Sequence, residues 1–305
     1  SRRVTTRMRN RARLLQRRWM QSKGCNMAAF DQFARSSPHR VVGLPIWVDG
    51  VAGSIGAYEA PGDRRGGWSV EFPGGRRELL GSIRPEQLAE PAEAPIPLES
   101  ERGQALLEEC CQADRAAFDA LWQHFRVQEA MTTCGVASAA HLLRAAPAAE
   151  SADGFARDER GVLQAAGEAV SGEKLAVSGL TLPELGGMLA ALGLEAEVRH
   201  AEGPVAGAAG EREALLRALR AAPNQLVILN YHMSTAGQVP FGGHFSPLAA
   251  YNASARRLLV LDVWPYTGPC WCTEDRIWAA MGAEDSESGK PRGWIAVRFG
   301  FGSAV

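Results

Sequence analysis

The order of helical and strand patterns along the chain constrains the fold most. Between residues 104 and 221, apolar residues recur at spacings of three and four, which predicts helices over 104–126, 134–145, 182–192 and 211–221. Four apolar runs of strand length follow, over 226–232, 244–251, 258–263 and 294–299. Because helices come first and consecutive strands later, we predict an α+β fold with an antiparallel sheet.

A second β-rich pattern precedes the helices. Residues 38–85 contain short apolar segments separated by turn signals, and Trp68, Val70 and Phe72 alternate with polar residues as in a half-buried strand. We predict a small SH3-like module there; a β-rich decoration packed on the main domain is the alternative. Residues 86–100 are rich in Pro, Ala and Glu, which is typical of a linker, and the main domain is expected over 101–305.

Charge is distributed unevenly. Residues 1–30 hold eight Arg and one Lys without any acidic residue, whereas the rest of the chain holds 24 basic and 34 acidic residues. We expect residues 1–37 to be a basic, disordered extension, either a transit peptide or sequence without a folded role. The acidic remainder argues against nucleic acid as a partner, because no basic face is available to displace counterions from phosphates.

The length of the apolar stretches and the number of cysteines exclude two further classes of protein, membrane-spanning proteins and disulfide-rich secreted proteins. No stretch of about 18 apolar residues occurs, so no membrane span is expected. Six cysteines among 305 residues are too sparse for a disulfide scaffold and indicate a reducing compartment. We therefore expect a cytoplasmic protein, or an organellar one if the Arg-rich start is a transit peptide.

Cys134 is the first candidate for chemistry. It stands where the 134–145 helix should begin, and the N–H groups and dipole at a helix N-terminus lower the pKa of a cysteine thiol. Gly135 offers little steric cover to this thiol. Taken alone, the pattern also fits a small buried cysteine of the core.

His244 and Asp262 are the second candidate. They stand on neighbouring predicted strands, and a hairpin centred on Ala253 pairs residues whose numbers sum to 506, as 244 and 262 do. The two side chains would then face each other across the sheet, so that the carboxylate could orient the imidazole and stabilise its charged form. Such a pair can also be purely structural.

Gln128 and four neighbours of the other candidates complete the predicted site. A side-chain amide six residues before Cys134 could donate to the oxygen that becomes negative during acyl transfer. Glycines permit close approach of a substrate backbone. The predicted substrate-binding residues are Gly135, Gly243, Phe245 and Ser246.

Several segments resemble the catalytic domain of phytochelatin synthase. These are residues 128–138 (QEAMTTCGVAS), 230–247 (NYHMSTAGQVPFGGHFSP), 258–263 (LLVLDV) and 289–294 (GKPRGW), supported by 178–198 and 277–281. The resemblance covers about 104–300 in order, and the Gln-to-Cys interval of six and the His-to-Asp interval of eighteen agree with the family pattern. The GHFSP segment is the most specific match.

This resemblance implies a papain-like fold and a glutathione γ-glutamylcysteinyltransferase. Cys134 would be the nucleophile, His244 the base and acid, Asp262 its orienting partner and Gln128 the oxyanion donor. The enzyme would release glycine from glutathione and pass γ-Glu-Cys to a second glutathione in heavy-metal detoxification. No tightly bound cofactor is expected; ions such as Cd, Zn and Cu would act as activators or as metal–thiolate complexes of the substrate.

The sequence departs from the family pattern in three places. Ala130-Met131 stand where the family usually has Glu-Pro, and Pro265 stands where it has an Arg thought to grip the γ-glutamyl group; Arg292 or Arg256 is a candidate replacement. Third, we expect the chain to end at Val305, directly after the catalytic domain, without the Cys-rich C-terminal region of the plant members. Short forms of this kind lean toward hydrolysis of glutathione with little polymerisation, which is the alternative function.

The remaining cysteines suggest an alternative of another class. Cys270 and Cys272 form a C-x-C pair that could bind a soft metal ion through thiolates, although two ligands alone make an incomplete site. A structural role for the pair is the simpler interpretation. If the active site has decayed, the protein would instead be a metal–thiolate binding protein.

Overall fold

A computed structural model describes residues 45–48, 51–59, 67–71, 77–79, 94–146, 156–201, 209–238, 242–265 and 267–299. Backbone contacts divide the chain into two units: one comprises residues 1–94 with 237–240, and the other comprises 95–236 with 241–305. The predicted basic extension over 1–37 lies outside the described residues. Within the described part of the chain, no helix is long and apolar enough to cross a membrane.

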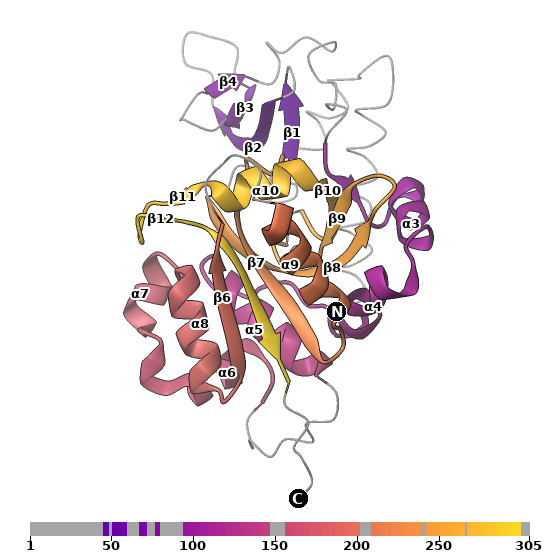
Figure 1. Cartoon of the computed structure of the whole chain (residues 1–305). Coiled ribbons are helices and arrows are strands. Elements are labelled where there is room, and N and C mark those ends of the chain that lie inside the picture. The colour runs from indigo at the N-terminus through magenta and orange to yellow at the C-terminus, as the bar shows by residue number, and fades with distance from the viewer. Residues whose placement is uncertain are drawn as a thin grey trace, which may run out of the picture. The chain divides into compact units, whose positions relative to one another are not determined.

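The first unit contains a four-stranded antiparallel sheet in the order β1-β2-β3-β4 (Figure 1). Its strands are β1 (Pro45–Val48), β2 (Val51–Glu59), β3 (Gly67–Glu71) and β4 (Arg77–Leu79). Val70 and the neighbouring Ser69 are both buried, so the one-sided burial predicted from the alternating pattern is not observed at this pair. An SH3-like arrangement of these strands stays a prediction.

The second unit is built on a seven-stranded antiparallel sheet in the order β5-β10-β9-β8-β7-β13-β6. The strands are β5 (Ile96–Pro97), β6 (Glu195–His200), β7 (Gln225–His232), β8 (Gly243–Asn252), β9 (Arg257–Val260), β10 (Cys270–Thr273) and β13 (Gly293–Arg298). A short hairpin of β11 (Glu284–Asp285) and β12 (Lys290–Pro291) precedes β13. The central strands are buried on both faces because helices cover both sides of the sheet.

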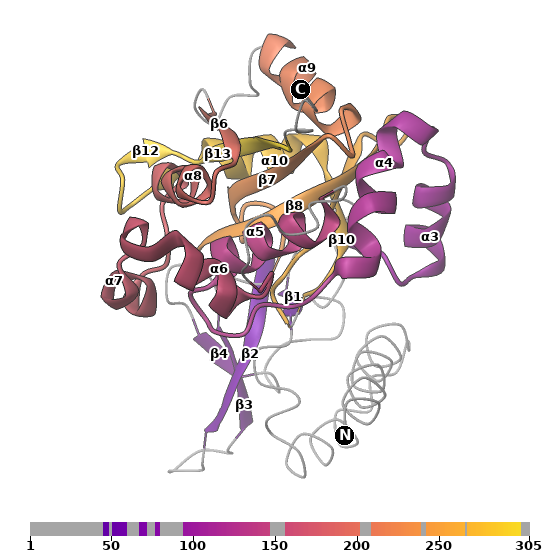
Figure 2. The ribbon, with the colours of Figure 1, turned by 90° about the horizontal axis from the view of Figure 1, so that it is seen from below.

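The helices of this unit are α3 (Glu101–Glu108), α4 (Gln112–Leu121), α5 (Cys134–Ala145), α6 (Glu159–Ala166), α7 (Gly172–Val177), α8 (Leu182–Ala191), α9 (Ala209–Arg220) and α10 (Glu274–Gly282). Two 3₁₀ turns, η5 (Trp122–His124) and η6 (Gly167–Ala169), follow α4 and α6. Figure 2 shows α5 and α6 on one side of the sheet and α9 with α10 on the other. The α+β class predicted from the order of patterns is therefore confirmed.

Helix α5 can lie directly against the sheet because its buried face consists of small residues. Val136, Ala139 and Ala140 are completely buried, and a side chain at Gly135 would meet the Phe245 ring of β8 at 3.4 Å. The close approach brings the first turn of the helix to the beginning of β8. The positions of Cys134 and His244 follow from this packing.

The structure corrects the register predicted for the β8–β9 hairpin. Its turn centres on residues 254–255, with Arg256 at φ 50°, and paired residues such as Asn252 and Arg257 sum to 509. An irregularity between Leu248 and Ala250 then shifts the register to 508. Asp262 lies beyond the end of β9 and is not directly opposite His244. The contact between the two side chains is therefore diagonal and not between paired positions of the sheet.

Other differences concern short elements. The helix predicted over 104–126 is divided into α3 and α4 at residues 109–111, where Cys111 takes an extended conformation as the N-cap of α4. Strand β5 pairs with β10, so the predicted linker over 86–100 contains part of the main sheet. The prediction did not include α6, α7, α10, β6 or β10.

Candidate active site

Cys134 is the first residue of α5 and is 9% exposed. Its thiol forms a hydrogen bond with the His244 imidazole and accepts hydrogen bonds from the backbone of Phe245 and Gly135. Burial opposes ionisation of this thiol, but the charge of His244 and these hydrogen bonds outweigh burial and lower the pKa of Cys134. The site therefore favours a thiolate at this position.

His244 stands at the start of β8 and is almost completely buried. Its Nε2 lies 2.9 Å from Oδ1 of Asp262, which leaves Nδ1 as the ring nitrogen for Cys134. Burial opposes the charged imidazole, but Asp262 and Cys134 stabilise it and raise the pKa of His244 to about 10. An imidazolium between a thiolate and a carboxylate is the electrostatic consequence.

Asp262 is completely buried, and both carboxylate oxygens have donors. Oδ1 accepts the backbone N–H of Trp264 at 2.8 Å in addition to the imidazole N–H. Oδ2 accepts the hydroxyl of Thr267. The segment after β9 thus folds back around the carboxylate and fixes the oxygen that faces His244.

Two aromatic rings hold the imidazole from its sides. Tyr231 and Trp264 both meet the His244 ring edge-on, with ring centroids 5.8 Å and 6.4 Å away. Both side chains are buried, so they exclude water from the hydrogen bond between His244 and Asp262.

Gln128 lies in the loop before α5, but its amide is turned toward that loop. Nε2 donates to the carbonyl oxygens of Ala130 at 2.6 Å and Met131 at 3.1 Å, which uses both amide hydrogens. Oε1 is buried and has no hydrogen-bond partner within the described residues. In this conformation Gln128 organises the loop, and its predicted role as oxyanion donor stays a prediction.

Glu159, at the start of α6, secures the same loop from outside. Its Oε1 accepts the backbone N–H of Glu129 at 2.8 Å, and its carboxylate also accepts the hydroxyl of Thr133, the N-cap of α5. Burial raises the pKa of Glu159. This loop contains Ala130-Met131 instead of the Glu-Pro expected from the family resemblance, and a carboxylate from another helix restrains it.

Arg292 brings a second buried charge to the site. Its guanidinium lies against the Cα of Gly243, where an added Cβ would come within 2.0–2.6 Å of guanidinium atoms, and its charge acts on the Cys134 thiolate. Nη1 and Nη2 donate to Asn230 and Asp285 at 3.4 Å each, while Nε is buried without a partner within the described residues. A buried guanidinium with an unpaired donor and two long hydrogen bonds is held at an energetic cost that a neighbouring anion can offset.

The other candidate cation, Arg256, lies elsewhere. Its guanidinium is about half exposed and pairs with Glu274 and Asp275 at 3.2 Å each, on α10. Of the two arginines considered as replacements for the missing cation at Pro265, only Arg292 stands beside Cys134.

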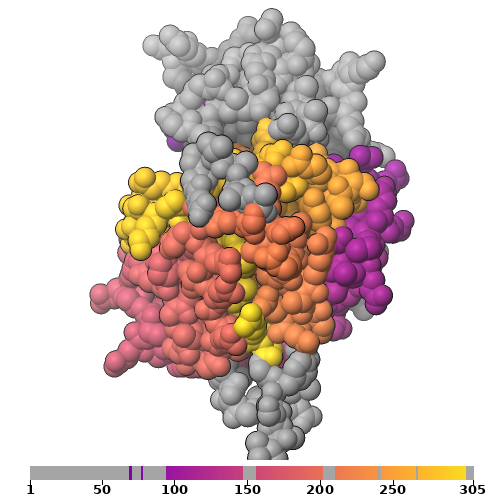
Figure 3. Space-filling model, viewed as in Figure 1, coloured from indigo at the N-terminus to yellow at the C-terminus, as the bar shows by residue number. Residues whose placement is uncertain are grey.

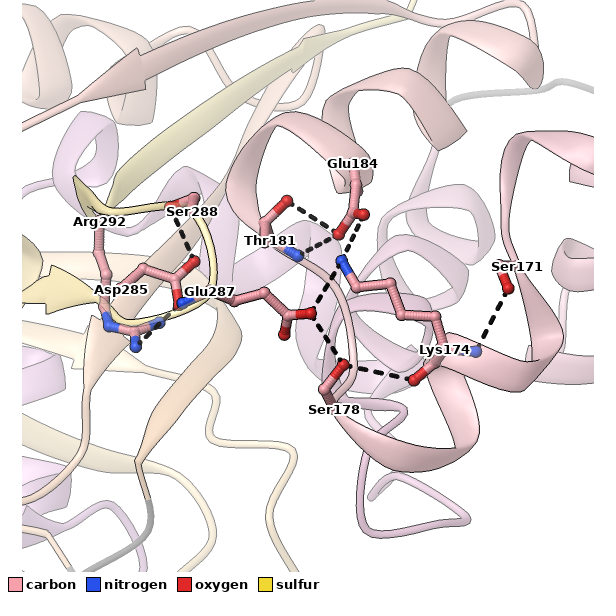
Figure 4. A network of polar contacts seen from close by, with 9 residues as sticks. All are labelled: Ser171, Lys174, Ser178, Thr181, Glu184, Asp285, Glu287, Ser288 and Arg292. Atoms are coloured by element: carbon pink, nitrogen blue, oxygen red, sulfur yellow. Dashed lines mark hydrogen bonds and ion pairs between the residues drawn. The ribbon is translucent and has the colours of Figure 1, made fainter.

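The β11–β12 hairpin connects Arg292 to the α7–α8 region, as Figure 4 shows. Asp285 accepts from Arg292 and from the Ser288 hydroxyl, and Glu287 of the same hairpin accepts from Lys174 and the Ser178 hydroxyl. These contacts hold the hairpin that precedes Arg292.

The predicted substrate-binding residues occupy different surroundings. Gly135 and Phe245 pack against each other beside Cys134, and Gly243 provides the surface for the Arg292 guanidinium. Ser246 is completely buried, and its hydroxyl donates to the Phe245 carbonyl and accepts from the Val263 N–H. Ser246 therefore holds the β8–β9 region together and has no open face toward a substrate.

Cys270 and Cys272 lie on β10 with their sulfur atoms 3.9 Å apart, both buried. Among the residues that the structure describes, no group of three or more His, Cys, Asp or Glu side chains could hold a metal ion. The predicted metal-binding role of the two thiols stays a prediction.

Sequence reasoning missed Thr267, Trp264 and Glu159. Thr267 follows Asp262 by five residues in a loop without periodicity, and Glu159 comes from a helix that was not predicted. Of the three, only Trp264 could have been predicted from the sequence, because a large aromatic residue two positions after Asp262 can exclude water from its carboxylate.

Comparison with known proteins identifies the family to which the sequence of this chain is similar. Three curated relatives are each called a glutathione gamma-glutamylcysteinyltransferase: one from Schizosaccharomyces pombe is 32% identical over 73 residues, number 3 from Lotus japonicus is 36% identical over 72, and number 1 from Arabidopsis thaliana is 36% identical over 72. These alignments cover 23–24% of this chain and 15–17% of the relatives. The family model described as phytochelatin synthase matches residues 86–294, more than half of the chain. The chain belongs to the phytochelatin synthase family.

Proposed function

We propose that this protein is a cysteine-dependent acyltransferase that cleaves the Cys–Gly bond of glutathione and transfers γ-Glu-Cys to a second glutathione. The observation that carries the proposal is the continuous set of contacts from the Cys134 thiol through His244 to the buried Asp262. A nucleophile, a base and an orienting carboxylate in mutual contact are what acyl transfer requires. The helical layer bearing Cys134 and the antiparallel sheet bearing His244 support a papain-like fold.

The first half of the reaction uses the ion pair between Cys134 and His244. The thiolate attacks the carbonyl carbon of the Cys–Gly peptide, and the electron pair of that carbonyl moves onto its oxygen. When the tetrahedral intermediate collapses, the C–N bond breaks and the imidazolium gives its proton to the amine of the departing glycine. A thioester between γ-Glu-Cys and Cys134 remains, with His244 neutral.

The second half uses the neutral imidazole. His244 takes a proton from the α-amine of a second glutathione as that nitrogen attacks the thioester, so an amide bond forms while the C–S bond breaks. The thiolate and imidazolium are regenerated, and the chain is ready for another cycle. Water in place of the amine gives γ-Glu-Cys, so the transferase and the hydrolase differ only in the acceptor.

The negative oxygen of the intermediate needs hydrogen-bond donors. The first N–H groups of an α-helix have no acceptor within the helix, and the N–H of Cys134 is one of these. Gln128 could contribute only after its amide leaves the Ala130 and Met131 carbonyls. We propose the Cys134 N–H as the donor in the conformation described, with Gln128 as a second donor after that rearrangement.

Arg292 accounts for the choice of a carboxylate-bearing peptide as substrate. Glutathione carries one carboxylate at the γ-glutamyl end and one at glycine. Because the Nε of Arg292 is buried, a carboxylate of the bound peptide would reach this guanidinium through Nη1 or Nη2, whose bonds to Asn230 and Asp285 are long at 3.4 Å. Such a pairing would offset the cost of burying the guanidinium. We propose that Arg292 supplies the cation missing at Pro265.

Incubating the purified protein with glutathione tests the proposal. Glycine release by the wild-type protein, and its loss in Cys134→Ala, is the expected result; retained release in Cys134→Ala would refute the nucleophile assignment. Chromatography for (γ-Glu-Cys)n-Gly products, with and without cadmium, separates transfer from hydrolysis. The same assay tests the proposed role of metal–glutathione thiolates as substrates in metal detoxification.

The Cys270–Cys272 pair tests the rival metal-binding interpretation. We expect a variant with Cys270→Ser and Cys272→Ser to release glycine at the wild-type rate without added metal, because both sulfurs are buried on β10 and the hydrogen bonds that lower the pKa of Cys134 come from His244, Phe245 and Gly135. Tight cadmium binding that disappears in this variant, together with no glycine release by the wild type, would select the rival.

A further inference from the structure

A groove lined by arginines lies outside the candidate active site. It has a volume of about 690 Å³, within the range of about 300–1,000 Å³ that small-molecule pockets occupy. Its walls are α9 and β6, and β13 forms its floor. Figure 3 views this face, where atoms of β13 appear between those of β6 and α9.

Four guanidinium groups from three elements line the groove. They belong to Arg199 on β6, Arg217 and Arg220 on α9, and Arg298 on β13. Glu197 is the single acidic residue among the lining residues. Ala214 and Ala218 on α9, and Ala221 directly after the helix, also line the groove, and their small side chains leave the space open.

The arginines are only lightly engaged. Arg199 pairs with Glu197, Arg217 with Glu213, Arg220 with Asp114, and Arg298 with Glu195 and Gln225. Each guanidinium has five N–H groups, and these bonds use one or two of them. The ion pairs of Arg199, Arg217 and Arg298 are exposed and contribute little to stability, so a ligand with several charges can displace or share them. Arg220 pairs with the buried Asp114 and offers only its remaining N–H groups.

Contacts with Trp294 of the floor and with Gln225 of β7 restrain two of the four guanidinium groups. The Arg199 guanidinium stacks over the Trp294 ring at 5.3 Å from its centroid, which holds it over the groove. Arg298 is similarly fixed by Gln225 at 2.8 Å. Guanidinium groups that are already positioned lose less entropy when they bind an anion.

We propose that this groove binds a small polyanion carrying two or more phosphate or carboxylate groups. The planar guanidinium forms paired hydrogen bonds with either group, and four of them around one cavity match a ligand with several negative charges rather than a single ion. The far end of the groove is separated from the candidate active site by most of the length of β7, whereas Trp294, at the near end, lies two residues after Arg292. Gln225 at the start of β7 lines the groove and His232 at its end pairs with Gly243, roughly 20 Å along the strand.

Calorimetric titration of the 305-residue chain with inorganic tripolyphosphate, and separately with citrate, tests the proposal. We expect one saturable site per chain for at least one of the two, and the preferred probe identifies the charged group. A variant with Arg217→Gln and Arg298→Gln should bind at least about tenfold more weakly, the effect of losing one charge-assisted hydrogen bond. Both arginines are more than half exposed, so the fold should tolerate the changes.

A variant with Arg102→Gln and Arg160→Gln is the matched control, because it removes the same two charges from exposed positions on α3 and α6. Binding that is absent, or that weakens equally in both variants, would overturn the proposal; the latter would indicate attraction to overall charge, including that of residues 1–30. Cys134→Ala should bind the probe like the wild type, so the groove is tested whether or not the proposed catalysis holds.

Discussion

Replacement of Asp262 by Asn tests the electrostatics of the site most informatively. The substitution keeps the size of the side chain but removes a buried negative charge 2.9 Å from the imidazole Nε2. Two opposite unit charges about 4 Å apart attract by about 4 kcal/mol at an effective dielectric constant of about 20. One pKa unit corresponds to about 1.4 kcal/mol, so the substitution should lower the pKa of His244 by about three units.

The change should be visible in the reactivity of Cys134. In the wild type the raised pKa of His244, about 10, keeps the imidazole charged at neutral pH and the thiol ionised. Alkylation by iodoacetamide should therefore be nearly as fast at about pH 7 as at about pH 9. In Asp262→Asn the neutral thiol and neutral imidazole become more populated relative to the thiolate–imidazolium pair. Alkylation at about pH 7 should therefore fall at least about tenfold and recover as the pH rises.

Mass spectrometry of the peptide that contains Cys134 separates this thiol from the other cysteines. Glycine release from glutathione should fall by orders of magnitude, about 10⁴-fold in the serine-protease analogue. Asp119→Asn, which alters an exposed carboxylate on α4, is the control and should change neither measurement. An alkylation profile in Asp262→Asn that matches the wild type at every pH would refute the assigned role of the carboxylate.

Two further substitutions probe the surroundings of the site. Gly243→Ala should raise KM for glutathione at least about tenfold with a smaller effect on kcat, because its Cβ would displace the Arg292 guanidinium. Gly242→Ala is the control, since a Cβ there meets nothing within 4 Å, and it should match the wild type. Equal kinetics for the two variants would contradict the substrate role of Arg292. Thr267→Val should shift the pH profile of Cys134 alkylation in the same direction as Asp262→Asn but by less, because the Asp262 carboxylate loses one charge-assisted hydrogen bond. Thr267→Ser keeps the hydroxyl and should have the wild-type profile. A wild-type profile in Thr267→Val would show that the hydroxyl is dispensable.

The sequence was most informative where a local pattern has one structural solution. The helix over 134–145 was predicted with both ends correct, because a Thr before a run of small apolar residues marks a helix start. The helix at 182 was identified equally well from its Thr-Leu-Pro-Glu opening, in which Glu184 completes a capping box with Thr181.

Register was not predictable in the same way. The meeting of His244 and Asp262 was expected, but the predicted centre of the hairpin was wrong, since Arg256 in the left-handed conformation and the irregularity near Ala250 move every pairing. Neither feature has a distinctive sequence signal. The contact forms nevertheless because Asp262 lies in an irregular segment after β9, where its side chain can reach the imidazole.

The roles of side chains that depend on tertiary packing could not be predicted from the sequence either. Arg292 was one of two arginines that could replace the missing cation, and only the position of the β11–β12 hairpin distinguishes it from Arg256. The orientation of the Gln128 amide depends on the carbonyl oxygens of its own loop, which no residue pattern reveals.

Mass spectrometry of the protein quenched during turnover with glutathione tests the central claim most directly. We expect the peptide containing Cys134 to gain the mass of glutathione minus glycine, as a thioester that hydroxylamine removes. Free glycine should appear in equal amount. An adduct that keeps the glycine and is released by reduction, or glycine formed without any modification of Cys134, would contradict the account.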